Sequence, residues 1–421
     1  MGHVSIGLVG CGTVGQSVVE LLERQRDSFE ERGDVSLDLD HIVDMDLSRI
    51  PEGYSRSSVI SDIVDNDVTN VVVELVGGVN PAYTIVKRSL ENGKHVVTAN
   101  KALIAEHGPE LEEIALRNNV YLFYEAAVGG GIPVINGLNN GLSGNEVSEI
   151  FGIVNGTTNF ILTQMSKHGM TYNDALSLAQ EKGFAEADPS FDVEGKDAAQ
   201  KIAILASLNS GKLVSSEGID TKGIIGVKKE DIGYAQELGY EVKLIAIARE
   251  AEGGLDVRVG PMLVPQSHPL ASVDYAMNAI YLGGHTHVTM SGEGAGGMAA
   301  GSAVVSDIKR VAMKMDEEYQ SRRYFGSEEA DILGKDRIES AYFLLFDGQN
   351  VPGTLSHLTT ALKKNNINVE KALQKEAAGK YVPIVVMTSV APMSAVERCL
   401  SELNPDKVQL RSYYPLLNSG E

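Results

Sequence analysis

Ser5–Gly15, SIGLVGCGTVG, is the stretch that decides the fold of the N-terminal part of the chain. A short apolar run is followed at once by glycines in the pattern G-x-G-x-x-G and then by a helical periodicity. This context of strand, glycine turn and helix predicts a dinucleotide site, because amides at a helix N-terminus favour phosphate. A glycine turn in another kind of α/β unit stays open as the alternative. The predicted cofactor-binding residues of the turn are Gly10, Gly12, Thr13, Val14 and Gly15.

A second predicted strand, Leu37–Val43, ends at an Asp-Met-Asp segment that begins with Asp44. An acidic residue at this strand end accepts hydrogen bonds from the adenosine ribose and repels a 2′-phosphate. We therefore predict that Asp44 binds the cofactor and that NAD is preferred over NADP. Arg49 and Arg56 could neutralise a phosphate, which leaves NADP open as the alternative.

Apolar strands alternate with helical stretches over the next hundred residues or so. The predicted strands are Val71–Val76, His95–Thr98 and Val120–Tyr124. This alternation predicts a parallel, doubly wound sheet of the Rossmann type, with ligands at the C-terminal ends of the strands. Lys101 follows such an end, where it would meet a cofactor or substrate. Its position alone leaves a solvated lysine at a helix start equally open.

Changes in sequence texture divide the chain into predicted domains. After a Rossmann domain of residues 1–133, residues 134–299 are typical of an α+β catalytic and dimerisation domain. Residues 300–318 are predicted to pack back on the first domain, and a highly charged stretch indicates a linker at 319–338. The order of predicted elements in residues 339–421 is βαββαβ, a ferredoxin-like arrangement. The predicted fold class is therefore α/β, with an α+β middle domain and a ferredoxin-like tail.

Gly183–Lys201, GFAEADPSFDVEGKDAAQK, is dense in carboxylates and runs into an apolar helix. Asp197 and Lys201 stand at positions i and i+4 of that helix, so they share a face. An ammonium at the head of a buried apolar stripe needs a paired charge. The pattern favours an acid–base lysine in a polar pocket, and an ordinary surface pair whose lysine stem covers apolar surface is the alternative.

The composition excludes several classes of function. A formal net charge of −21 at pH 7 argues against a nucleic-acid-binding surface and against anionic membranes. The sequence contains neither a signal-peptide pattern at its start nor a long apolar span. Two cysteines cannot form a disulfide framework and suit a reducing compartment. We therefore expect a cytoplasmic protein without nucleic-acid or membrane partners.

Five motifs along the chain together resemble homoserine dehydrogenase. They are GLVGCGTVG from Gly7, VVTANKALIA from Val96, EAAVGGGIPVI from Glu125, GIVNGTTNFILTQM from Gly152 and GFAEADPSFDVEGKDAAQK from Gly183. The last two are far more distinctive than the glycine fingerprint. The tail resembles an ACT domain, a regulatory fold often attached to enzymes of amino-acid biosynthesis. No kinase-like region precedes the dehydrogenase, so the resemblance is to the monofunctional form.

The resemblance implies reversible, NAD(P)-dependent interconversion of L-homoserine and L-aspartate 4-semialdehyde in threonine, methionine and isoleucine biosynthesis. Lys201 matches the proton donor of the family, and Lys101 matches a second active-site lysine close to nicotinamide and substrate. Gly294 falls in the glycine loop that closes over the nucleotide. The implied substrate-binding residues are Gly183, Glu186, Asp192 and Asp197.

The resemblance also implies a monovalent cation, sodium or potassium, near the cofactor-facing loop. Its ligands would be the carboxylate of Glu125 and the carbonyl oxygens of Val128, Gly130 and Ile132. For the tail it implies feedback by an amino acid, with L-threonine as the expected effector, through contacts in a homodimer or larger homo-oligomer. A purely structural dimerisation role for the tail is the alternative.

Two other functions stay open at this stage. One is a different amino-acid dehydrogenase on the same scaffold. The other is a non-catalytic, nucleotide-sensing regulator whose tail binds an amino acid.

Overall fold

The computed structural model describes residues 2–33, 35–315, 325–374 and 379–418. Its chain forms two compact units. The first unit contains Met1–Ile150, Ala198–Ile219 and Met277–Ala330, and the second contains Phe151–Asp197, Asp220–Ala276 and Asp331–Glu421. Residues 134–150, 198–219 and 277–299, which the sequence assigns to the middle domain, thus cluster with the N-terminal part of the chain. The domain boundaries stay a prediction, and residues 319–324 of the predicted linker lie outside the described residues.

The first unit is built on a parallel sheet. Its strands are β1 (Gly2–Val9), β2 (Val35–Val43), β3 (Ser55–Ser57), β4 (Val71–Glu74), β5 (His95–Thr98) and β6 (Leu122–Phe123). They lie in the order β3-β2-β1-β4-β5-β6, and all five pairings are parallel. Every residue of β4 is buried, as expected of a strand covered on both faces. The predicted Rossmann-type fold is confirmed.

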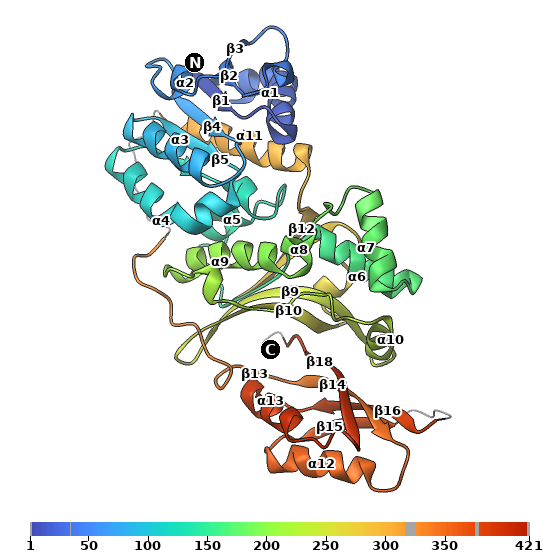
Figure 1. The fold of residues 1–421 in the computed structure, drawn as a ribbon. Coiled ribbons are helices and arrows are strands. Elements are labelled where there is room, and N and C mark those ends of the chain that lie inside the picture. Colours follow the sequence, from blue (N-terminus) through green and yellow to red (C-terminus); the bar gives the residue numbers. More distant parts are fainter. Residues whose placement is uncertain (1, 34, 316–324, 375–378, 419–421) are drawn as a thin grey trace. The chain divides into compact units, whose positions relative to one another are not determined.

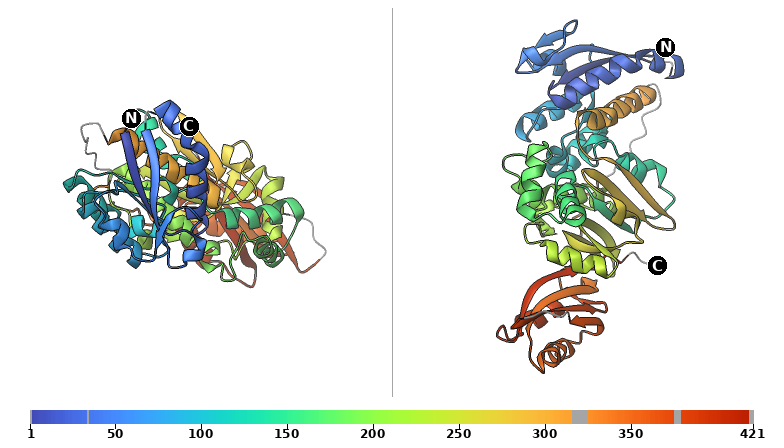
Figure 2. Two further views of the ribbon diagram at one scale, coloured as in Figure 1. Left: turned by 90° about the horizontal axis from the view of Figure 1, so that it is seen from above. Right: turned by 90° about the vertical axis from the view of Figure 1, so that its right-hand side faces the viewer.

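Helices from both ends of the first unit cover this sheet. Helix α1 (Thr13–Gly33) and helix α11 (Gly297–Lys314) lie side by side, as Figures 1 and 2 show. Helix α11 overlaps the segment 300–318, whose last residues, 316–318, lie outside the described residues. The other helices of the alternating units are α2 (Ser61–Val64), α3 (Asn80–Glu91) and α4 (Lys101–Arg117).

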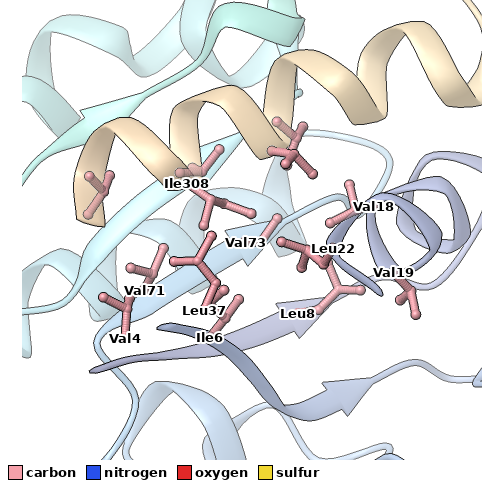
Figure 3. Packing of buried hydrophobic residues seen from close by; sticks show 14 of the residues in the cluster. Val4, Ile6, Leu8, Val18, Val19, Leu22, Leu37, Val71, Val73 and Ile308 are labelled. Atoms are coloured by element: carbon pink, nitrogen blue, oxygen red, sulfur yellow. The ribbon is translucent and has the colours of Figure 1, made fainter. Parts of the chain in front are cut away.

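The main core of the first unit lies between the parallel sheet and these two helices (Figure 3). Ile6 and Leu8 point from β1 to the same side, because alternate residues of a strand share a face. They pack in one cluster with Val18 of α1 and Ile308 of α11. The cluster therefore fixes the start of α1, and with it the glycine turn, relative to α11.

The first unit also contains a hairpin, most of helix α9 (Lys196–Ser210) and several short helical turns. Strands β11 (Met277–Gly283) and β12 (His287–Glu293) pair antiparallel. The glycine-rich segment after β12 leads directly into α11. The short helical pieces are Leu47–Arg49, Glu125–Ala127, α5 (Val134–Asn136), the π-helical turn Gly137–Gly141 and Ser216–Gly218.

The second unit contains a mainly antiparallel sheet. Strands β9 (Tyr240–Ala251) and β10 (Gly254–Pro265) pair along their whole length. Strand β8 (Asp220–Thr221) runs parallel to β10, and β7 (Glu149–Ile153) is the neighbour of β9 on the other side. This sheet with its helices confirms the predicted α+β character of the middle of the chain.

Two helices of the second unit, α6 and α10, pack against β9. Helix α9 begins in the second unit and continues into the first. The helices are α6 (Gly156–His168), α7 (Tyr172–Glu181), α8 (Ser190–Val193), α9 (Lys196–Ser210) and α10 (Lys229–Glu237), with the short turn Pro269–Ser272 after β10.

The tail has the predicted βαββαβ order. Its elements are β14 (Tyr342–Gln349), α12 (Thr354–Lys364), β15 (Val369–Gln374), β16 (Tyr381–Thr388), α13 (Met393–Ser401) and β18 (Val408–Pro415). The antiparallel sheet has the order β15-β16-β14-β18, which is the ferredoxin-like arrangement. The short strands β13 (Glu339–Ser340) and β17 (Ala391–Pro392) form a separate pair.

The tail is attached to β10 and α10 within the second unit. The amide of Leu417 donates to the carbonyl oxygen of Leu263 at 2.9 Å. The hydroxyl of Tyr414 donates to Oδ2 of the buried Asp231 at 2.7 Å. The end of the tail is therefore tied both to β10 and to α10. In the part of the chain that the structure describes, no helix is long and apolar enough to cross a membrane.

Candidate active site

The glycine turn exposes open backbone at the start of α1. Gly10 has a φ of +100°, and a Cβ there would lie 2.7 Å from the carbonyl oxygen of Leu75, so only glycine fits. A Cβ on Gly15 would overlap the carbonyl group of Gly10. By contrast, a Cβ on Gly12 would meet none of the described atoms within 4 Å. The turn therefore leaves space at the helix N-terminus where a phosphate can approach the amides.

Asp44 lies beside this turn. Its Oδ2 accepts a hydrogen bond from the amide of Cys11 at 2.6 Å, and its Oδ1 accepts one from the amide of Asp46 at 2.8 Å. The carboxylate at the end of β2 is thus fixed against the glycine turn. A carboxylate can accept further hydrogen bonds with its remaining lone pairs. The position suits the ribose contact that the sequence predicts.

A cavity of about 440 Å³ in the first unit brings together residues from distant parts of the sequence. It lies between the start of α1, the loops that follow β4 and β5, and the loop between β12 and α11. Both predicted catalytic lysines therefore line one cavity together with Val14 of the glycine turn. The predicted site residues among its lining are Val14, Lys101, Gly130, Lys201 and Gly294.

Lys101 is the first residue of α4, and its position is set by the residue before it. The side-chain oxygen of Asn100 accepts a hydrogen bond from the amide of Leu103 at 3.1 Å, which caps the helix. The Asn100 amide group donates to the carbonyl oxygens of Val76 at 3.2 Å and Gly78 at 2.8 Å. Asn100 therefore ties the start of α4 to the loop after β4, and Lys101 enters the cavity from that fixed start.

Glu74 lies beneath this loop and was not predicted. It ends β4 and is fully buried, where its carboxylate accepts hydrogen bonds from the Thr98 hydroxyl at 2.5 Å and the Val76 amide at 2.7 Å. Burial raises the pKa of Glu74 to about 7, against the hydrogen bonds, which lower it. Its contacts join the ends of β4 and β5, from which the cavity is built.

Lys201 lies on α9 with only 9% of its surface exposed. Asp197 stands one turn earlier on the same helix and is 3% exposed. An ordinary surface ion pair would leave both groups in water, so the surface alternative does not fit this burial. A buried ammonium and a buried carboxylate one turn apart are typical of a functional site.

Asn155 joins two of the predicted substrate-binding carboxylates in the second unit. Its amide nitrogen donates to Oδ1 of Asp192 at 2.7 Å and to Oδ2 of Asp197 at 2.8 Å. Its side-chain oxygen accepts from the amide of Thr158 at 2.9 Å, which caps α6. One asparagine thus holds both carboxylates at the start of a helix. We did not assign Asn155 a role, although it lies in the distinctive N-G-T-T-N motif.

Gly183 and Glu186 lie on the loop after α7. Gly183 has a φ of +75° and ends the helix with its amide bonded to the carbonyl oxygen of Gln180 at 3.1 Å. Glu186 is exposed, and its carbonyl oxygen accepts from the Gln180 side chain at 3.1 Å. Its carboxylate makes no hydrogen bond or ion pair to any described residue. Asn155 therefore brings Asp192 and Asp197 together, and it makes no such bond to Glu186.

The sequence matches three family models. They are homoserine dehydrogenase at residues 133–308, the NAD-binding domain of homoserine dehydrogenase at 10–125, and the ACT domain at 342–404. A homoserine dehydrogenase of Pseudomonas aeruginosa is 39% identical over 404 residues, which cover 92% of each chain. The chain belongs to the homoserine dehydrogenase family.

Solved structures of the homoserine dehydrogenase family agree with this assignment. The enzyme of Thiobacillus denitrificans has a TM-score of 0.92 and 35% identity, covering 99% of this chain and 98% of that one. A hyperthermophilic archaeal homoserine dehydrogenase in complex with NADPH has a TM-score of 0.63 and 27% identity, covering 76% of this chain and all of that one. The predicted resemblance, the NAD(P)-dependent oxidoreductase activity on CH–OH and the ACT domain are confirmed. The two alternative functions are not favoured.

The loop that the family resemblance assigns to a cation follows β6. Glu125 is buried, and its carboxylate oxygens accept from the amides of Ile135 at 2.8 Å and Asn136 at 2.7 Å. Burial raises the pKa of Glu125. Among the described residues, no donor bonds to the carbonyl oxygens of Val128 or Gly130.

Ile132 differs from the other two carbonyl groups of this loop. Its carbonyl oxygen accepts from the amide of Val134 at 2.8 Å, although a carbonyl oxygen has a second lone pair. A buried carboxylate beside carbonyl oxygens with open lone pairs is a set of hard oxygen donors. The residues of the loop therefore fit a small cation.

Asp307 of α11 is a second buried carboxylate beside Glu125, and it was not predicted. Its Oδ2 accepts from the Glu125 amide at 2.8 Å. Burial raises the pKa of Asp307 to about 7, and the charge of Glu125 adds to this shift. Arg310 lies 4.0 Å from its other oxygen and opposes the shift. Asp307 thus ties α11 to the start of the loop that follows β6.

Proposed function

We propose that this member of the homoserine dehydrogenase family interconverts L-homoserine and L-aspartate 4-semialdehyde through Lys201 and Lys101. The observation that carries the proposal is that both lysines line the cavity that also contains Val14 of the nucleotide turn and Gly294. Two ammonium groups suit a reaction in which hydride reaches an aldehyde carbon, because the oxygen then gains negative charge.

Bound NAD(P) supplies or accepts the hydride. During reduction, Nζ of Lys201 donates a proton to the carbonyl oxygen of the semialdehyde, and during oxidation it takes the proton back from the homoserine hydroxyl. Nζ of Lys101 stabilises the negative charge on the same oxygen. Because Lys201 is largely shielded from water, its interaction with that charge is weakly screened.

We assign substrate binding to Gly183, Glu186, Asp192 and Asp197. The substrate carries an ammonium group, which Asp192 and Asp197 suit by charge. Asn155 acts as a positioning residue, because its two donated hydrogen bonds fix one oxygen of each carboxylate. The exposed Glu186 is free to turn toward the substrate, whereas the buried Asp197 is held in place.

For the cofactor we propose a preference for NAD. The carboxylate of Asp44 beside the glycine turn would repel a 2′-phosphate, and Met45, which follows it, is exposed and uncharged. The archaeal relative was solved with NADPH, so NADP is the alternative.

Steady-state homoserine oxidation with NAD and with NADP tests the proposed reaction and the proposed cofactor preference. Absorbance of the reduced nicotinamide is followed, with L-aspartate in place of homoserine as the control. We expect turnover with homoserine but not with L-aspartate. We also expect a higher kcat/KM with NAD than with NADP. Lack of turnover with either cofactor would contradict the reaction, whereas a higher kcat/KM with NADP would contradict only the cofactor preference.

We also propose that a sodium or potassium ion binds at Glu125 and the carbonyl oxygens of Val128, Gly130 and Ile132. Such an ion would neutralise the buried Glu125 carboxylate and hold the loop that borders the nucleotide cavity. Two observations support this proposal. The loop offers carboxylate and carbonyl oxygens as ligands, and Gly130 lines the cavity.

For the tail we propose feedback inhibition by L-threonine, transmitted in a homodimer or larger homo-oligomer. The ACT domain family indicates an amino-acid ligand, and threonine is an end product of the proposed biosynthetic role. We further propose a cytoplasmic location, which the two buried free cysteines, Cys11 and Cys399, support.

A further inference from the structure

A second cavity, of about 260 Å³, lies in the second unit between β10 and the tail. Its size falls below the roughly 300–1,000 Å³ of sites for drug-sized ligands, so it suits a small metabolite. Strands β8 and β10 form one wall, and β14, β18 and the start of α13 form the other. None of the residues to which we assigned a role in catalysis lies in its lining.

The floor of this cavity contains a hydroxyl group without a partner. Tyr342 is 1% exposed, and its hydroxyl makes no hydrogen bond to any described residue. Tyr342 lines the cavity together with Arg258, while its side chain also packs in the apolar cluster of the tail. A buried hydroxyl without a partner costs free energy. A ligand oxygen that accepts from Tyr342 would remove that cost.

The lining of the cavity is cationic. Lys222, Arg258 and Lys335 contribute three positive charges, against one negative charge from Asp220. Lys335 pairs with Glu397 at 2.8 Å. Lys222 forms no ion pair with a described carboxylate, and its ammonium lies 4.5 Å from the ring centre of Tyr413. One cation at the cavity is therefore available for an anionic ligand.

The positive charge of Arg258 is only partly neutralised by its carboxylate partner. Arg258 is 5% exposed and donates from Nε to Asp256 at 2.9 Å. The same carboxylate also pairs with Arg249 at 3.0 Å. Two guanidinium groups therefore share one buried carboxylate, which leaves a net positive charge behind the cavity floor. A buried positive charge of this kind favours a ligand with an overall negative charge.

The walls of the cavity also touch the loop that carries the predicted substrate carboxylates. The amide of Lys222 donates to the carbonyl oxygen of Val259 in β10 at 2.8 Å, and the amide of Ile224 donates to that of Val193 at 2.9 Å. Val193 follows Asp192 directly. A Cβ on Gly223 would overlap the carbonyl group of Val193, so the two segments are in close backbone contact. Movement of Lys222 would therefore reach the segment that holds Asp192.

We propose that this cavity is a regulatory site for a small carboxylate with net negative charge, which Lys222 and Tyr342 bind. The ligand carboxylate accepts hydrogen bonds from the Lys222 ammonium and the Tyr342 hydroxyl, while Arg258 stabilises its charge. Binding links the tail to β8 and β10 and, through Ile224 and Val193, changes the affinity for homoserine. This regulatory consequence rests on the proposed reaction, whereas binding itself does not.

Isothermal titration calorimetry of the full chain with succinate and with L-aspartate tests the site without turnover. We expect binding of at least one probe to the parent chain. Lys222→Met, which keeps most of the stem, and Tyr342→Phe, which removes only the hydroxyl, should each weaken it about tenfold or more. The control is Lys371→Met, at an exposed lysine of β15 outside the cavity, which should bind as the parent does.

Lack of binding of both probes to the parent chain would overturn the proposal, as would unchanged binding in Lys222→Met. Homoserine oxidation without either probe is measured in parallel. Because Lys222 is outside the proposed catalytic residues, Lys222→Met should keep the activity of the parent. A chain that binds the probes but does not oxidise homoserine would contradict the proposed function and leave the cavity assignment standing. If the parent chain is active, its KM for homoserine is also measured with a saturating concentration of the probe. An unchanged KM would overturn the proposal that binding in this cavity regulates the affinity for homoserine.

Discussion

Lys201 combines three properties that are separate in the sequence: burial, a place in the cavity at the start of α1 and a carboxylate one turn away. Lys201→Ala should therefore lower kcat for homoserine oxidation by roughly 10²-fold or more, because it removes the proposed proton donor. Cofactor binding, measured by the fluorescence of reduced nicotinamide, should change little.

The matched control is Lys196→Ala, at an exposed lysine on the first turn of the same helix. Its ion pair with Glu194, at 2.6 Å, is solvent-exposed and contributes little to stability. Lys196→Ala should keep the parent kcat. Turnover near that of the parent chain in Lys201→Ala would remove Lys201 from the mechanism.

Glu74 gives a prediction on pH. Its pKa of about 7 in the folded chain lies above the value of about 4.3 for an unperturbed glutamate. The folded state therefore binds more protons between these two values, and the free energy of unfolding falls as the pH rises through that window. Glu74→Gln removes the titration and keeps an oxygen for the Val76 amide.

Denaturant unfolding between about pH 5 and pH 8 measures this effect. The stability of the parent chain relative to Glu74→Gln should decrease as the pH rises, by up to about 3 kcal/mol across the window. Glu91→Gln, at an exposed position at the end of α3, should follow the parent chain. Parallel pH profiles of the parent and Glu74→Gln would contradict the prediction.

At the scale of single residues, the motifs predict functional residues that lie within one short segment of the sequence. Lys101 and Lys201 were found because each lies in a distinctive segment. Glu74, Asp307 and Asn155 were missed because their partners are remote in the sequence: Glu74 meets Thr98, Asp307 meets Glu125 and Asn155 meets Asp197. A single sequence shows that Glu74 ends a strand, but not that its carboxylate is enclosed.

At the scale of helices and strands, the elements were predicted best where the hydrophobic periodicity is regular and turn residues mark the ends. The parallel, doubly wound sheet and the βαββαβ tail were predicted from alternating strands and helices with glycine turns, whereas the order β3-β2-β1-β4-β5-β6 and the short strand β3 come from the structure. The close approach of the two glycine loops could not be predicted, because it joins the loop after β6 to the loop after β12. A Cβ on Gly130 would lie 2.6 Å from the carbonyl carbon of Gly294.

The loop after β12 therefore yields a prediction at the scale of elements. A Cβ on Gly294 would overlap the side chain of Asn278, which is buried in β11. Gly294→Ala should displace this loop from the cavity and weaken binding of the reduced cofactor about tenfold or more, because a well-packed interior resists added volume. Fluorescence titration with NADH and NADPH measures the loss.

Gly141→Ala provides the control, because a Cβ there would meet none of the described atoms within 4 Å. It should bind both cofactors as the parent chain does. Unchanged affinity in Gly294→Ala would mean that this loop is not part of the nucleotide site, even though it lines the cavity.

At the scale of the whole molecule, the sequence predicted a tail with its own core, and the structure adds how that core is attached. The tail cluster packs Tyr342, Leu344 and Phe346 of β14 with residues of both tail helices. The attachment to β10 and α10 depends on the backbone of Leu417 and on the buried pair of Tyr414 and Asp231. Neither contact has a local signal, because each joins residues more than a hundred positions apart.

Removal of residues 338–421 should abolish inhibition of homoserine oxidation by L-threonine, if the tail carries the effector response. The truncation exposes the surface of β10 to which Leu417 binds, so a full-length variant is needed beside it. Tyr414→Phe leaves Asp231, a fully buried carboxylate, without its hydroxyl partner, which should cost about 1–3 kcal/mol. Because this pair joins the tail to α10, threonine inhibition should also weaken in the variant.

Tyr381→Phe, on β16 of the tail, is the control and should keep the parent response to threonine. Inhibition is measured as the L-threonine concentration that halves the rate, and thermal unfolding reports the loss of attachment in Tyr414→Phe. A parent chain that threonine does not inhibit would contradict the feedback proposal. Full inhibition in both the truncation and Tyr414→Phe would contradict it as well, because the response would then have to arise in residues 1–337 alone.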